Sequence, residues 1–139
     1  MDDTPARLAR IEAMLHALTG GADAAVAEAP ASLAATALAM RRAALRHLGQ
    51  AMADGPAQAI LLDLHVSAAE GRRVFVHDAC VASGVPMSTA LRWVATLAKA
   101  GLVAKAPDAK DGRRTLLSLT DAGRARIDAL LADWAALAR

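Results

Sequence analysis

Apolar side chains recur along most of this chain at intervals of three and four residues, which is the spacing of helices. Near the N-terminus, Thr4-Pro5 predicts a helix start, because threonine caps helices and proline is tolerated in their first turn. Gly20-Gly21 ends this helix, and its apolar residues form a narrow stripe: Leu8, Ile11, Leu15 and Leu18. A narrow stripe favours packing against a partner helix, although it is also compatible with a place in the chain's own core.

Two further helices are predicted on either side of a Gly-Pro break. An alanine-rich connection over residues 21–30 precedes the second helix, which extends from Ser32 to about Gly49. Asp54-Gly55-Pro56 then breaks the chain and begins the third helix. The side chains available for burial are Leu38, Leu45 and Leu48 in the second helix, and Ile60, Leu61 and Leu64 in the third.

After Gly71 the pattern changes to short apolar segments separated by turn residues. It predicts a strand at 73–76, a short helix at 77–82 closed by Ser83-Gly84, and a longer helix from Pro86 to Ala100. Two strands at 102–106 and 114–119 then flank a turn at 107–112. Thr120-Asp121 caps a last helix, whose apolar stripe is Ile127, Leu130, Leu131, Trp134 and Leu137.

This order of elements predicts a mainly α fold with a small β-hairpin wing, that is, a winged helix-turn-helix with N- and C-terminal dimerisation helices. We expect residues 1–50 to form N-terminal helices that serve dimerisation, and residues 51–126 to form the winged helix-turn-helix. Residues 120–139 would form a C-terminal helix that packs on the N-terminal part or at the dimer interface.

The longer helix has one apolar face, formed by Ala90, Val94 and Leu97, with Trp93 at its edge. Its other face carries Met87, Ser88, Leu91, Arg92 and Ala95. A recognition helix reads base edges in the major groove from its N-terminal residues, which predicts DNA contacts for Met87, Ser88, Thr89 and Arg92. The same face, lightly charged and partly apolar, is also compatible with a protein-contact surface formed by Met87, Leu91 and Trp93.

The predicted wing, with its tip at residues 108–114, is rich in basic residues. Arginine at a hairpin tip suits a narrow minor groove, where the negative potential is deepened. Asp111 would hold the base of the wing by pairing with a nearby arginine, which leaves another free for DNA. The basic residues expected to contact phosphates or the minor groove are Lys99, Lys105, Lys110, Arg113 and Arg114.

Charge is divided along the chain more sharply than its net value of +2 suggests. Residues 1–71 carry a net charge of −3, residues 72–126 a net charge of +6, and residues 127–139 a net charge of −1. A basic segment within an otherwise mildly acidic chain indicates an anionic partner for that segment, although a solvated basic face would have the same composition.

The remaining reactive residues suggest no catalysis, cofactor or metal site. The four histidines have no ligand spacing, and a lone Cys80 is expected to be an inert buried thiol, the alternative being a redox switch. No nucleophile triad, phosphate loop or carboxylate pair is present, so we do not expect an enzyme. The acidic start is unlike a signal peptide and no apolar run is long enough to span a membrane, which favours a cytoplasmic protein.

Two sets of residues resemble the MarR-type family of regulators. Asp111-Gly112-Arg113, five residues, Leu119-Thr120, two residues and Gly123 fit that family's D-x-R-x5-L-T-x2-G signature. Gly84-Val85, Ser88-Thr89, Arg92, Leu97 and Gly101-Leu102-Val103 also fall where its helix-turn-helix pattern places them. The match extends from about Ala57 to Ile127.

The resemblance implies a homodimeric bacterial transcription regulator that binds an inverted-repeat site in double-stranded DNA. It places Ser88, Thr89 and Arg92 in the major groove and Arg113 in the minor groove, and implies a small-molecule effector bound where the dimer helices meet the winged helix. The alternative is a winged-helix protein-interaction module without sequence-specific DNA binding.

The chain departs from the family in three respects. Pro86 stands where a capping Ser or Thr is usual, so the recognition helix would begin without a side-chain cap. The helical segment after the wing is shorter than in many relatives, and the N-terminal part is longer. We therefore expect dimerisation to have moved partly to the N-terminal helix.

Overall fold

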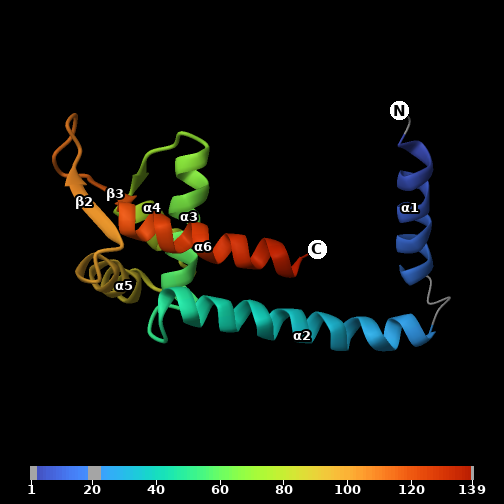
Figure 1. The fold of residues 1–139 in the computed structure, drawn as a ribbon. Coiled ribbons are helices and arrows are strands. Elements are labelled where there is room, and N and C mark those ends of the chain that lie inside the picture. The colour runs from blue at the N-terminus through green and yellow to red at the C-terminus, as the bar shows by residue number, and fades with distance from the viewer. Residues whose placement is uncertain (1–2, 19–22, 139) are drawn as a thin grey trace. The chain divides into compact units, whose positions relative to one another are not determined.

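Six helices and three short strands make up residues 3–18 and 23–138, which the computed structural model describes. The chain divides into two compact units, residues 1–38 and residues 39–139. The predicted fold class is confirmed: the second unit contains a helix-turn-helix followed by a small antiparallel sheet with a protruding hairpin (Figure 1). None of the helices within the described ranges is both long and apolar enough to cross a membrane.

The first unit contains α1 (Thr4–Leu18), which begins at the predicted threonine. The stripe predicted on this helix is exposed, with exposed fractions of 53% for Leu8, 51% for Ile11 and 55% for Leu15. These three side chains are therefore not buried within the first unit. The side chain of Leu18 and the Gly20-Gly21 stop lie outside the described residues.

Helix α2 (Asp23–Leu48) begins well before the predicted Ser32. The prediction of a connection as far as Pro30 was wrong from Asp23 onward, because the segment is rich in alanine, the residue with the highest helix propensity. Leu48 is buried and Leu45 partly buried, as expected. Leu38 is 52% exposed, contrary to the prediction, because it precedes the part of α2 that packs in the second unit.

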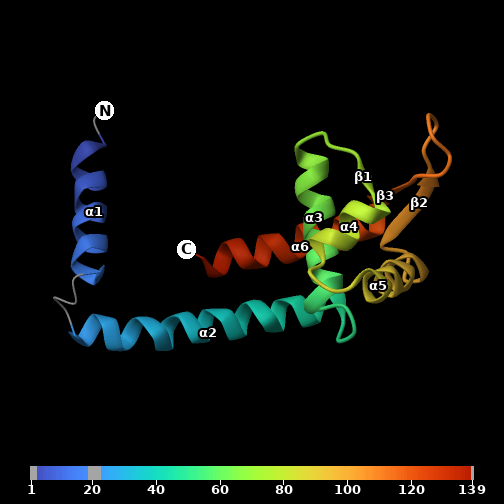
Figure 2. The ribbon, with the colours of Figure 1, turned by 180° about the vertical axis from the view of Figure 1, so that it is seen from behind.

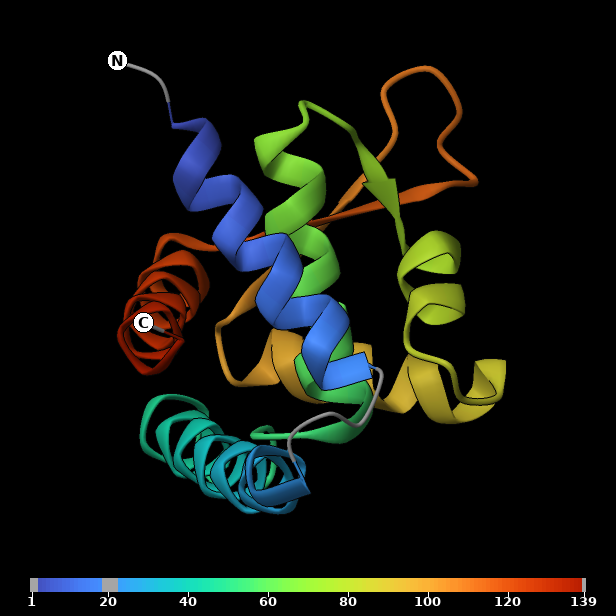
Figure 3. The ribbon, with the colours of Figure 1, turned by 90° about the vertical axis from the view of Figure 1, so that its right-hand side faces the viewer.

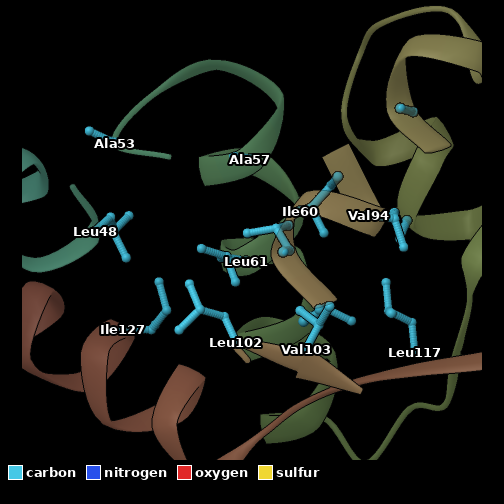
Figure 4. Close-up of a cluster of buried hydrophobic side chains, with 14 of the residues drawn as sticks. Leu48, Ala53, Ala57, Ile60, Leu61, Val94, Leu102, Val103, Leu117 and Ile127 are labelled. Atoms are coloured by element: carbon cyan, nitrogen blue, oxygen red, sulfur yellow. The ribbon is translucent and has the colours of Figure 1, made fainter. Parts of the chain in front are cut away.

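The core of the second unit forms around α3 (Gly55–Ala69). Ile60, Leu61 and Leu64 are buried as predicted. Figure 4 shows Ile60 and Leu61 among side chains from α2, α5, the sheet and α6. Most of this close packing comes from aliphatic residues, and it fixes the positions of the helices and the sheet around α3 relative to one another.

The helix-turn-helix consists of α4 (Val76–Ala82) and α5 (Met87–Lys99). Gly84 lies in the turn between them with φ of +75°, and Gly101 follows α5 with φ of +78°, conformations that glycine adopts at little cost. Pro86 and Ala100, predicted as the ends of the recognition helix, are its N-cap and C-cap. The prediction of this helix is therefore confirmed to within one residue at each end.

Strands β1 (Val74–Phe75), β2 (Val103–Pro107) and β3 (Thr115–Leu119) form an antiparallel sheet in the order β1-β3-β2. Leu117 of β3 lies opposite Val74 on one side and Lys105 on the other. The β2–β3 hairpin is the wing. Figures 1 and 2 show that its tip and α5 project from the same side of the second unit.

Helix α6 (Asp121–Leu137) packs against α3 and runs beside the C-terminal part of α2 (Figures 1 and 3). Ile127 and Leu130 are buried as predicted, and Trp134 donates a hydrogen bond of 2.9 Å from Nε1 to the carbonyl oxygen of Met40. The predicted stripe is too long by one residue, because Leu137 is 37% exposed. It lies at the end of the helix, where it has few neighbours to pack against.

Asp133 joins α6 to α2 by charged contacts. Its carboxylate lies 2.7 Å from Nε2 of His47 and 3.4 Å from the guanidinium of Arg46. The pKa of Asp133 lies below its ordinary value, first because of the hydrogen bond with His47 and then because of Arg46. These contacts hold the C-terminal end of α2 alongside the C-terminal half of α6.

Candidate nucleic-acid interface

Helix α5 separates a buried face from an exposed one, as the sequence predicts. Ala90, Val94 and Leu97 are 0%, 2% and 0% exposed, and Trp93 is partly buried at the edge. The opposite face is available to a partner. Its exposed residues include Met87, Ser88, Thr89, Leu91 and Arg92.

The N-terminus of α5 has no side-chain cap. Pro86 supplies none, and its carbonyl oxygen accepts the first helical hydrogen bond, 2.9 Å from the nitrogen of Ala90. The first N–H groups of a helix have no acceptor within the helix and form its positive end. This end therefore offers donors at the place where Ser88 and Thr89 are also exposed.

The wing is fixed by a buried carboxylate that sequence reasoning did not single out. Asp108 has a side chain only 1% exposed, and its two oxygens each accept a hydrogen bond of 2.9 Å, one from Arg73 and the other from Arg114. Its backbone nitrogen also donates to the carbonyl oxygen of Arg114, 2.9 Å away. Asp108 thus ties the start of the wing loop to both its end and the segment before β1.

The electrostatics of Asp108 agree with that geometry. Its pKa lies below the ordinary value, chiefly because its carboxylate accepts a hydrogen bond from the backbone N–H of Lys110, and further because of Arg73 and Arg114. Both guanidinium groups also lie over the ring of Phe75, at 5.9 Å for Arg73 and 4.3 Å for Arg114. A carboxylate, two arginines and an aromatic ring therefore form a single anchor at the base of the wing.

Nearer the tip, Asp111 pairs with Arg113. One oxygen of Asp111 accepts from the backbone nitrogen and from Nε of Arg113, at 3.1 and 3.2 Å. The side chain of Arg113 is nevertheless 92% exposed. Its remaining guanidinium donors are therefore available to an acceptor on another molecule.

The other basic residues predicted for DNA contact are Arg92 and Lys99 on α5, Lys105 on β2 and Lys110 in the wing loop. All four are exposed. Across the part of the chain that the structure describes, none of the ion pairs involves them. Their charges are therefore available to an anion.

A groove lies between α5 and the base of the wing. It has a volume of about 530 Å³, and Met87 and Leu91 of α5 face Arg113 and Arg114 across it. Phe75 and the first residues of α4 also line it. The two predicted parts of the interface, the recognition helix and the wing, thus form one continuous concave surface.

Sequence reasoning missed Arg73, Phe75 and Asp108 in this arrangement. Two arginines and an isolated aromatic residue, Phe75, were visible close together, but nothing in the spacing connected them to an acid more than thirty residues later. Their approach to Asp108 follows from the pairing of β3 with both β1 and β2, which a linear pattern does not contain.

The end of the D-x-R-x5-L-T-x2-G signature has a structural explanation. Thr120 caps α6 by accepting a hydrogen bond of 3.0 Å from the nitrogen of Gly123, and its hydroxyl donates to the carbonyl oxygen of Gly101 at 2.6 Å. A Cβ on Gly123 would lie 2.0 Å from the carbonyl oxygen of Leu102, so only glycine fits there. Leu119-Thr120 and Gly123 therefore hold the sheet and α6 against the end of α5.

Cys80 lies in α4 with 1% of its surface exposed. Burial raises the pKa of its thiol, which disfavours the reactive thiolate. Within residues 3–18 and 23–138, no three His, Cys, Asp or Glu side chains are grouped so that they could hold a metal ion.

Residues 58–123 match the family of winged helix DNA-binding domains. No curated protein has a significantly similar sequence.

Several solved structures share the fold. The YusO protein from Bacillus subtilis is 25% identical, with a TM-score of 0.60 over 84% of this chain and 80% of its own. A MepR mutant from S. aureus bound to an oligodeoxyribonucleotide is 21% identical, with a TM-score of 0.60 over 71% of this chain and 70% of its own. The PcaV transcriptional regulator from Streptomyces coelicolor, in complex with its natural ligand, is 24% identical, with a TM-score of 0.52 over 99% of this chain and 79% of its own.

Proposed function

We propose that this chain is a sequence-specific transcription regulator of MarR type that binds double-stranded DNA, because residues 58–123 match winged helix DNA-binding domains and the fold is shared with MarR-type regulators. The observation that carries the proposal is the common orientation of two basic elements. The outer face of α5 and the tip of the wing project on the same side (Figures 1 and 2), and their basic side chains are exposed. A duplex presents a major groove and a flanking minor groove to such a surface.

The contacts divide into two classes. Ser88, Thr89 and Arg92 read base edges in the major groove, with Met87 against a thymine methyl group. Arg113, almost fully exposed, enters the minor groove. The remaining basic residues contact phosphates, which adds affinity and salt dependence without reading sequence: Lys99, Lys105, Lys110 and Arg114.

Arg114 has a double role in this proposal. Its guanidinium is bonded to Asp108 and lies over Phe75, yet 53% of its side chain is exposed. An arginine carries five N–H donors, so the anchor leaves donors for a phosphate. Asp108 and Phe75 would hold Arg114 in place before DNA arrives, which lowers the entropy cost of contact.

The regulator would act as a homodimer on an inverted repeat, each protomer placing one α5 in a major groove, with the two sites about one helical turn apart. Leu8, Ile11 and Leu15 support this, because an exposed apolar stripe on a helix has a natural partner in a second copy. Under this proposal residues 1–50 supply part of the dimer interface and residues 51–126 bind DNA. The helix within 120–139 packs on the N-terminal part or at the dimer interface.

A small-molecule effector is part of the proposed function. The structurally similar PcaV transcriptional regulator was solved in complex with its natural ligand. MepR, similar in fold, was solved with an oligodeoxyribonucleotide. An effector that shifts the placement of α5 or the wing would change DNA affinity, since both elements must engage at once.

Exposed apolar side chains near the interface favour one competing function, a protein-interaction module. Val81 is 66% exposed, Leu91 46% and Met87 38%. In that case α5 would dock on a partner protein, and the basic residues of the wing would contribute only solubility.

Fluorescence anisotropy with a labelled random-sequence duplex separates the two functions. We expect the purified protein to bind at low salt, with affinity falling steeply between about 50 and 200 mM salt as counterions are released. The double variant Arg113→Ala, Arg114→Ala should bind at least about tenfold more weakly at each salt concentration, whereas Arg42→Ala, an exposed site on α2, should bind normally. Undetectable binding at low salt, or binding that the double variant leaves unchanged, would refute DNA binding.

A further inference from the structure

A second groove lies on another part of the winged helix, where α3, the sheet and the first turns of α6 meet. It has a volume of about 290 Å³. Leu64 and Ala68 of α3, Val74 of β1 and Leu117 and Leu119 of β3 form part of its wall. We call it the sheet-side groove. None of the residues that line it lies in α5 or in the wing loop, so it is separate from the proposed DNA-binding surface.

The apolar lining of the sheet-side groove is entirely aliphatic. Such a lining suits a hydrocarbon chain better than a flat ring, because no aromatic face is there to stack on. A volume of this size is at the small end of ligand sites, which favours a small occupant.

The charged residues at the groove all carry the same sign. Arg72, Arg73 and Arg124 line it, with no acidic residue among the lining side chains. Arg72 is paired with Glu70 at 2.6 Å and Arg73 with Asp108 at 2.9 Å. Arg124 forms none of the ion pairs found in residues 3–18 and 23–138, so its guanidinium is open to an anion.

We propose that the sheet-side groove binds a short aliphatic carboxylate, with its chain among the leucines and its carboxylate on Arg124. Arginine matches a carboxylate with two parallel N–H donors, which gives the charged end a defined position. The chain end would displace water from Leu119, which is only partly buried, and would lie over the buried Leu64 and Leu117.

The groove is connected to the wing through Arg73. This residue lines the groove, and its guanidinium also holds Asp108, the carboxylate at the base of the wing. A carboxylate in the groove would draw Arg73 toward itself and leave Asp108, only 1% exposed, with a single arginine. A buried charge that loses a partner is destabilised, so the wing would be held less firmly. The proposal therefore has a binding half, the carboxylate in the groove, and a regulatory half, its effect on the wing. The regulatory half rests on the proposed DNA-binding function.

Hexanoate and its neutral analogue hexanamide test the binding half without DNA. In amide NMR spectra of the full chain, hexanoate should shift resonances of residues that line the groove, such as Ala68, Ala106 and Ser118, and hexanamide should not. Arg124→Gln should weaken hexanoate binding by about tenfold, as expected when one charge-assisted hydrogen bond is lost. Arg126→Gln, an exposed arginine on the same helix outside the lining, is the matched control and should bind as the wild type does.

Two results would overturn the site. In the first, hexanoate causes no shifts at the groove. In the second, the shifts in Arg124→Gln depend on hexanoate concentration in the same way as those in the wild type. The spectrum of Arg124→Gln itself shows whether the variant is folded. Because this readout contains no DNA, failure here leaves the proposed function untouched.

The regulatory half is tested by anisotropy at constant ionic strength. Saturating hexanoate should weaken binding of a labelled duplex by about fivefold or more, the usual range for coupled sites, and should not do so in Arg124→Gln. Hexanoate that binds in the groove but leaves DNA affinity unchanged would contradict the coupling through Arg73. If the wild-type protein does not bind the duplex even without hexanoate, the result would instead contradict the proposed function.

Discussion

The first turn of α6 passes so close to the end of α5 that a Cβ on Gly123 would stand 2.0 Å from the carbonyl oxygen of Leu102. Side chains do not approach a backbone oxygen so closely, and neither α6 nor the strand that begins after Leu102 can move without disturbing the core. Glycine is therefore required here for packing, although it is an unfavourable residue inside a helix.

Replacing this glycine tests that relationship. We expect Gly123→Ala to lower the free energy of unfolding by about 3 kcal/mol, as overpacking does, even though alanine favours helix formation. The matched control is Gly112→Ala in the wing, where a Cβ would meet nothing within 4 Å, with an expected change below about 0.5 kcal/mol. Urea denaturation followed by circular dichroism measures both, and a stabilised Gly123→Ala protein would contradict the packing account.

We expect substitutions of the two wing arginines to differ in their effect on stability. Arg113→Ala should weaken DNA binding by about tenfold without changing stability, because its side chain is 92% exposed. Arg114→Ala should weaken DNA binding and also lower the urea midpoint, because Arg114 holds Asp108 and lies over Phe75. Equal effects of the two substitutions on stability would show that the anchor described for Arg114 is unimportant.

The anchor at Asp108 also predicts a pH dependence. The pKa of Asp108 is lowered in the folded chain, so its contribution to stability is present above the unfolded pKa of about 3.9 and is lost as the pH falls through the lower folded pKa. We therefore expect Asp108→Asn to unfold at lower urea than the wild type at pH 7, with the gap narrowing as the pH is lowered below about 4. A gap that is constant over this range would contradict an ionised, hydrogen-bonded Asp108.

If the exposed stripe on α1 forms part of the dimer interface, charged substitutions in it should weaken the dimer. Leu8→Asp with Ile11→Asp should weaken the dimer by about tenfold or more, because burying one such side chain contributes about 1.5–3 kcal/mol. Arg10→Asp, an exposed site off the stripe, is the control for the added charge. Light scattering over a dilution series measures the equilibrium. Equal dimer stability in the double variant and the control would place the interface elsewhere.

Features that depend on local periodicity were predictable. Ala90, Val94 and Leu97 recur at helical spacing with polar residues between them, so the buried face of α5 follows directly from the pattern. Gly84 and Gly101 mark the turn and the helix end, because their positive φ values are ones that glycine adopts at little cost.

Features that depend on tertiary contacts were not predictable in the same way. Leu38 belongs to the apolar pattern of α2 but is exposed, because the buried part of α2 lies after it, within the second unit. Arg73 and Asp108 are brought together only when the sheet forms, in which β3 pairs with β1 on one side and with β2 on the other. The sequence showed that the wing is rich in charged residues. Only the folded structure shows which of these side chains form ion pairs within the protein and which are available to a partner.

Selection of DNA fragments bound by the purified protein tests the central claim most directly. Fragmented DNA is incubated with the wild type and with Arg92→Ala, and the bound fraction is sequenced. We expect the wild type to enrich an inverted repeat whose half-sites lie about one helical turn apart, and Arg92→Ala to lose preference at one position of each half-site. Bound fragments with the same sequence composition as the input would contradict sequence-specific DNA recognition by α5.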